Sequence, residues 1–169
     1  MSAAGAFKAA RSAGVSIVID GGDLLLKARA QPAAALIDLL TRHKAGVVAL
    51  LSVGRDGWSG ADWLGFFDER AAIAGFNGDP PREKAEAQAF EACVCAWLNR
   101  NPVRSPPSRC LGCGGGELVH DPLLPFGVEP TGHAWLHSRC WRAWSASREG
   151  EAVGALARMG ILPPTDCAI

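Results

Sequence analysis

Four residues in the last third of this 169-residue chain have the types and the spacing of a metal site. Two residues separate Cys110 from Cys113, and two separate His137 from Cys140. Thiolates and imidazoles are the ligands of tetrahedral structural zinc, and a Cys-x2-Cys pair binds one ion from a tight backbone turn. The sequence therefore predicts a structural zinc ion bound by Cys110, Cys113, His137 and Cys140. Four protein ligands leave no open position for a reactive water.

The residues around the two pairs are suited to positioning these ligands. Gly112 and Gly114 let the backbone curl after Cys110, so that amide groups face the thiolates. Ser138 is a favourable N-cap for a helix predicted over residues 141–148. The second ligand pair would then stand at the start of this helix, where the helix dipole favours a thiolate.

Two other histidines are alternatives to His137 as the fourth ligand. His133 lies four residues before His137, but residues 132–136 have the pattern of a strand rather than a helix. His120 is the second alternative. Residues 121–127 are apolar and contain two prolines, and we expect a loop that packs over the metal or is exposed for recognition.

A cysteine knuckle, an intervening hairpin and a ligand pair on the first turn of a helix together resemble a treble-clef zinc finger, over about residues 108–150. The region also distantly resembles the treble-clef nucleases of the HNH type, which implies His120 or His133 as a general base. Those enzymes carry an acidic residue followed by histidine, and an asparagine between two histidines. Here His120 precedes Asp121, and residues 105–169 contain no asparagine. A nuclease is the enzymatic alternative.

The first 54 residues have the pattern of a small helix–hairpin–helix module. Its predicted elements are a helix over residues 3–13, strands over 15–19 and 24–28, and a tight turn over 20–23. Pro32 opens a helical stretch whose apolar residues recur at spacings of three and four. Gly46 is the candidate position for a break in that stretch.

This order of elements resembles the N-terminal docking domain of tubulysin-type non-ribosomal peptide synthetase subunits. The matching residues are Gly14, Val15, Ile17, Ile19, Asp20, Gly21, Leu24, Leu36, Leu40, Lys44 and residues 47–51. The resemblance covers less than a third of the chain. It implies a module that self-associates, or that captures a charged segment of a protein partner with its hairpin. Lys27 and Arg29 are the charged contacts that it suggests.

Residues 55–104 predict a helical hairpin. Ser59 and Asp62 have the spacing of a capping pair at the start of the first helix. Its predicted apolar face comprises Trp63, Phe66, Phe67 and Ile73. Residues 77–81 break this helix and begin the second, since proline suits a first helical turn.

Cys93 and Cys95 lie in the second of these helices, outside the predicted metal site. Positions two apart on a helix point about 200° away from each other, so the two thiols cannot easily bind one ion together. We expect both to be buried thiols.

The composition excludes several classes of protein. The 49% hydrophobic content and balanced charge are unlike a disordered chain, and no apolar run reaches the roughly 18 residues of a membrane span. The first 15 residues lack the apolar core of a signal peptide. Six cysteines without a secretion signal favour a reducing cytoplasm, where they hold metal more often than disulfides.

The net charge of zero conceals an uneven distribution. Residues 1–55 carry +4 (7 basic against 3 acidic), residues 56–104 carry −3 (5 against 8), and residues 105–169 carry −1 (5 against 6). Binding to phosphates needs clustered Lys and Arg. A nucleic-acid-binding finger, with Arg139, Arg142 and Arg148 as contacts, is therefore the alternative rather than the first hypothesis.

The sequence as a whole predicts an α+β protein in three parts: a docking-like module over residues 1–54, a helical hairpin over 55–104 and a zinc-binding unit over 105–169. The layout also resembles small bacterial proteins from plasmid or prophage regions. The function expected is that of a non-enzymatic, zinc-stabilised docking or adaptor protein, with a nucleic-acid-binding finger or an HNH-like nuclease as alternatives.

Overall fold

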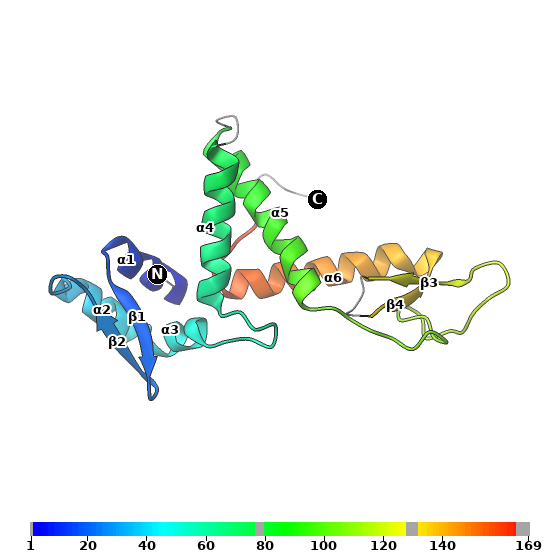
Figure 1. Cartoon of the computed structure of the whole chain (residues 1–169), viewed down its shortest axis with the longest axis horizontal. Coiled ribbons are helices and arrows are strands. Elements are labelled where there is room, and N and C mark those ends of the chain that lie inside the picture. Colours follow the sequence, from blue (N-terminus) through cyan, green and yellow to red (C-terminus); the bar gives the residue numbers. More distant parts are fainter. Residues whose placement is uncertain (1, 77–79, 128–131, 165–169) are drawn as a thin grey trace. The chain divides into compact units, whose positions relative to one another are not determined.

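The computed structural model describes residues 2–76, 80–127 and 132–164, and it has the α+β architecture that the sequence predicts (Figure 1). The elements are α1 (Ala3–Ser12), β1 (Ser16–Asp20), β2 (Asp23–Lys27), α2 (Ala34–Arg42), α3 (Lys44–Leu51), α4 (Gly60–Phe76), α5 (Arg82–Arg100), β3 (Leu123–Phe126), β4 (Ala134–His137) and α6 (Ser138–Arg158). Contacts divide the chain into two units, one built from residues 1–93 and 156–169 and the other from residues 94–155. The three-part division made from the sequence stays a prediction.

The predicted N-terminal hairpin is confirmed. Strands β1 and β2 pair antiparallel, and Gly21 and Gly22 form the turn with φ of 57° and 95°. These are left-handed conformations that glycine adopts at little cost. Because side chains alternate across a strand, Ile17 faces the core while Val18 and its cross-strand neighbour Leu25 remain 42% and 46% exposed.

The helical stretch that follows divides at His43, not at Gly46 as the sequence suggested. Gly46 lies inside α3, where a Cβ atom would stand 2.6 Å from the Cβ of Ala3 on α1. This glycine therefore serves the close approach of α1 and α3. Helices α1, α2 and α3 pack together, with Phe7 and Val47 among their buried residues.

The predicted cap of α4 is confirmed. The Asp62 carboxylate accepts hydrogen bonds from the Ser59 amide and hydroxyl, and the Asp62 amide donates to the Ser59 hydroxyl. Trp63 is buried, as expected, and its indole donates to Asp56. The predicted apolar face does not extend as far as Ile73, which is 43% exposed because it lies about 80° around the helix from the buried Trp63.

Helix α5 begins after Pro81, as predicted, and forms a helical hairpin with α4. The predicted break over residues 77–79 lies outside the described residues. Cys93 is buried, and burial raises the pKa of its thiol to about 11. The expectation that Cys95 is buried was wrong, because it lies about 200° around the helix from Cys93 and is exposed.

Within the second unit, β3 and β4 form an antiparallel hairpin that leads directly into α6. The expectation of a loop over residues 121–127 was wrong for Leu123–Phe126, which form β3. Pro125 is compatible with this strand because a two-stranded sheet leaves free edges. None of the helices in the described residues is long and apolar enough to cross a membrane.

Candidate metal centre

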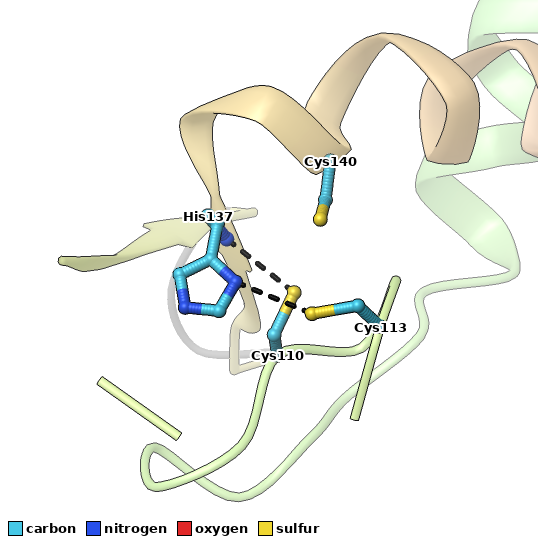
Figure 2. Close-up of side chains that lie close together, drawn as sticks. All are labelled: Cys110, Cys113, His137 and Cys140. Atoms are coloured by element: carbon cyan, nitrogen blue, oxygen red, sulfur yellow. Dashed lines mark hydrogen bonds between the residues drawn. The ribbon is translucent and has the colours of Figure 1, made fainter. Parts of the chain in front are cut away.

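The side chains of Cys110, Cys113, His137 and Cys140 converge at one point (Figure 2). Their candidate ligand atoms all lie within 4.8 Å of one another. Zn–S bonds of about 2.3 Å place the sulfurs of a tetrahedral site roughly 3.8 Å apart, so contraction by about 1 Å completes the shell. These four residues could therefore hold a metal ion such as zinc, and no second group of this kind occurs among the described residues.

The first pair of cysteines is held in a closed turn of the backbone. The Gly114 amide donates to the Cys110 carbonyl, and the Cys110 amide donates to the Gly115 carbonyl, both at 2.7 Å. Gly114 has a φ of 73°, which favours glycine. The Leu111 amide donates to the Trp135 carbonyl at 2.8 Å and so fastens this turn to β4. The expected knuckle is present.

The electrostatic surroundings favour thiolates at the first pair. Burial opposes ionisation of Cys110, but amide N–H groups of His137, Cys113 and Gly112 outweigh it and lower its pKa to about 6. The Gly115 amide and His137 also lower the pKa of Cys113. Thiolates are the form of cysteine that binds metal, so the lowered pKa values of this pair favour binding of a cation.

Cys140 has the opposite tendency. Burial and the two neighbouring thiols raise the pKa of its thiol, because three negative sulfurs at close range repel one another. A divalent cation between them would remove that repulsion. Cys140 therefore stays protonated near neutral pH when no metal is bound, and metal binding would displace its proton.

The His137 ring is oriented by a backbone carbonyl. Its Nε2 atom lies 2.9 Å from the Gly116 carbonyl oxygen, which can only accept, so Nε2 donates and carries the proton. In the neutral imidazole, Nδ1 is then the atom with the lone pair that could bind a metal, and it lies 3.4 Å from the Cys113 sulfur. Histidine ligands of metals commonly donate their other ring nitrogen to a carbonyl in this way.

The second ligand pair stands where β4 becomes α6. His137 is the last residue of β4, and Cys140 lies in the first turn of α6. The expectation that Ser138 caps this helix was wrong, because Ser138 is its first residue and its amide donates to the Asp121 carboxylate at 3.1 Å. The helix also runs to Arg158, ten residues beyond the predicted end.

Neither alternative histidine belongs to the group of converging ligands. His120 is exposed in the turn before β3. His133 is half-buried, and its ring lies edge-on to Trp135 with 6.3 Å between centroids. The structure therefore brings His137, rather than His133 or His120, to the three cysteines.

The charged residues suggested for partner binding lie far along the chain from the metal centre. Lys27 ends β2 opposite Ser16, and Arg29 follows in the connection to α2; both are exposed. Lys44 at the start of α3 forms an ion pair with Asp23 at the hairpin turn. The role of Lys27 and Arg29 in binding a partner stays a prediction.

Comparison with known proteins does not assign this chain to a family. The chain matches no protein-family model, and no curated protein or solved structure shows significant similarity to it. The docking-domain and treble-clef resemblances are thus hypotheses that rest on the residues of this chain alone.

The sequence did not reveal the contribution of Asp121 to this site. One carboxylate oxygen accepts from the Ser138 amide, and the other lies 3.5 Å from the Arg139 guanidinium. Asp121 therefore fixes the first turn of α6, between the two ligands of the second pair. An aspartate 17 residues before a helix carries no local capping signal, so only the folded hairpin reveals this contact.

We expect Asp121→Ala to weaken zinc binding and to lower stability by about 1 kcal/mol, the usual cost of losing a helix cap. Asp121→Asn keeps an acceptor for the Ser138 amide and should lose less. Competition with a chromophoric chelator measures the affinity, and thermal unfolding measures the stability. Equal zinc affinity in the alanine variant and the wild type would refute this positioning role.

Proposed function

We propose that this protein is a non-enzymatic interaction protein, and that one structural zinc ion holds its second unit together. The observation that carries the zinc assignment is the convergence of four ligand atoms within 4.8 Å, from a knuckle, a strand end and a helix start. Three thiolates and one imidazole complete a tetrahedral shell, which is the pattern of a structural rather than a catalytic zinc.

The small core of the second unit supports this role for zinc. Its buried cluster contains Cys110, Leu123, Ala134 and Leu136, with a few half-buried neighbours. A core of this size contributes little stability by itself, and small units commonly add a metal or disulfides. Zinc would join the knuckle, the hairpin and α6 at a single point.

The hairpin of the first unit supports the docking role. Val18 and Leu25 stand side by side on its outer face, each more than two-fifths exposed, and Lys27 continues that face. We call these three residues the hairpin face. Exposed apolar side chains next to free strand edges suit pairing with another chain, and a second copy of this chain is the simplest partner.

The nucleic-acid alternative has less support. Arg139 pairs with Asp121, while Arg148 pairs with Glu151 and donates to the Asn101 carbonyl. Two of the three arginines proposed as phosphate contacts are thus engaged within the protein. Arg142 alone does not provide the cluster of cations that phosphate binding needs.

We expect the zinc-loaded chain to self-associate through the hairpin face, with a dissociation constant that Val18→Asp raises at least tenfold. A buried carboxylate in that face would lose its hydration without gaining a partner. Sedimentation equilibrium measures the association. Val53→Asp is the matched control, because Val53 is 70% exposed in the same unit and lies outside the hairpin face.

Lys27→Glu and Arg29→Glu test the charged contacts, and their effect should shrink as salt is added. A chain that is monomeric at all concentrations, or a Val53→Asp variant as impaired as Val18→Asp, would remove the hairpin face as the site of self-association. The zinc assignment is independent of that outcome, because elemental analysis tests it directly.

A further inference from the structure

The second unit contains an apolar pocket that the metal centre does not use. It lies between the end of α5, the strand β3 and one face of α6, and has a volume of about 190 Å³. Phe126 and Trp141 stack at 4.2 Å between ring centroids, and Trp144 lies beside Trp141 at 5.6 Å. We call this cavity the Trp141 pocket.

The Trp141 pocket is bordered by positive charge. Arg148 is buried, lies over the Trp97 ring at 5.2 Å and lines the pocket. Two of its nitrogens bind Glu151 and the Asn101 carbonyl, so most of its donor capacity and part of its charge are satisfied within the protein. No acidic side chain is among the described residues that line the pocket.

A second guanidinium stands at the edge of the pocket. Arg104 is exposed, and its side chain packs on Gly132, which lines the pocket; a Cβ atom there would lie 3.2 Å from the Arg104 Cδ. Glu151 offsets part of the Arg148 charge, so Arg104 supplies the more accessible attraction. An occupant with negative charge near its apolar group would complement Arg104.

The volume of the Trp141 pocket indicates whether its occupant is a small molecule or a side chain of a protein partner. Pockets for drug-sized ligands and cofactors usually measure about 300–1,000 Å³. At about 190 Å³ the Trp141 pocket is smaller than this range and suits a single large side chain. A side chain inserted into an aromatic-lined pocket is the usual anchor of a protein interface.

We propose that the Trp141 pocket binds a large apolar side chain presented by an acidic segment of a partner protein. This proposal extends the interaction role proposed above, to a second surface and a defined partner chemistry. Arg104 would attract the acidic flanks while the aromatic walls enclose the anchor. A nucleic acid could stack on exposed Trp141 but would leave the apolar walls unfilled, so it fits less well.

The test uses the full zinc-loaded chain and three fluorescein-labelled synthetic peptides of equal length. One has a central phenylalanine between aspartates and glutamates, one replaces the phenylalanine with alanine, and one replaces the acids with lysines. We expect the first to bind at least tenfold more tightly than either of the others by fluorescence anisotropy. A single-stranded oligothymidylate is the nucleic-acid probe.

Two pairs of variants locate the binding. Ser145→Phe fills the pocket from α6 without removing its walls and should abolish binding, whereas Ser147→Phe makes the same change at an exposed position of that helix. Arg104→Glu should weaken binding of the acidic peptide at least tenfold, whereas Arg109→Glu changes an exposed charge that does not line the pocket. Zinc content confirms that each variant is folded.

Binding of the acidic phenylalanine peptide that only Ser145→Phe and Arg104→Glu impair would support the proposal. Equal binding of the three peptides, no binding at all, or equal effects of the two phenylalanine variants would overturn it. Tighter binding of the oligothymidylate than of the acidic peptide would also overturn it and favour nucleic acid. Loss of self-association in the hairpin variants would leave these results unchanged, so the two proposals can fail separately.

Discussion

Removing zinc at neutral pH is expected to unfold the unit formed by residues 94–155. Without the cation, Cys140 stays a thiol whose pKa is raised by burial and the neighbouring sulfurs, no bonds join the four ligands, and the small buried cluster cannot offset the entropy of the chain. Zinc-finger peptides gain roughly 10–16 kcal/mol of apparent binding free energy from their metal, which exceeds the stability of most small units.

Tryptophan fluorescence follows this transition, since four of the six tryptophans lie in residues 94–155. Elemental analysis should find one zinc per chain before chelation and none after it. Cys113→Ser should abolish stoichiometric zinc, while the same change at Cys95, which is exposed on α5 and outside the ligand group, should have no effect. A metal-free chain with an unchanged thermal transition would contradict the assignment.

The group of four converging side chains could be predicted from the sequence, because a zinc site constrains both residue type and spacing. Two pairs with the same short separation converge in the structure, as the sequence indicated. The choice of His137 over His133 depended on the strand before α6. Residues 134–137 form β4, which places His137 at its end and directs the His133 ring against Trp135.

Contacts between distant segments could not be predicted in this way. Asp121 is 17 residues from the amide that it caps, and nothing near α6 signals the contact. Leu123–Phe126 were expected to form a loop because Pro125 is unfavourable in a strand, but pairing with β4 outweighs that preference. Helix α6 extends ten residues beyond the predicted end at Arg148, through Gly150 and Gly154, although glycine disfavours a helix interior.

Local sequence patterns also did not distinguish a glycine that ends a helix from a glycine that lets two helices pack closely. Gly46 suggested the end of a helix, whereas its missing Cβ lets Ala3 on α1 approach α3. Glycine has both uses, and only the packing partner decides between them. The same ambiguity applies to the glycines of the knuckle. There, glycine-to-alanine substitutions can distinguish a need for space from a need for a left-handed backbone conformation.

Gly112→Ala is expected to weaken zinc binding about 10–100-fold, the range found when residues that orient metal ligands are changed. A Cβ atom at position 112 would lie 2.9 Å from the Cys140 Cβ and 3.4 Å from the Leu136 Cδ2. The Cys140 Cβ is fixed by the first turn of α6 and cannot rotate away. The new methyl group would therefore push the knuckle and α6 apart, and with them the two ligand pairs.

Gly116→Ala is the matched control, because the nearest atom to a Cβ there is the Ser108 carbonyl oxygen at an ordinary 3.7 Å. Gly114→Ala isolates backbone strain, since it meets no neighbour within 4 Å but has a φ of 73°. Chelator competition should rank zinc affinity as wild type and Gly116→Ala first and Gly112→Ala well below them. If Gly112→Ala binds zinc as tightly as Gly116→Ala, the two ligand pairs are not held in contact by this glycine, and the close packing of knuckle and helix does not support the metal.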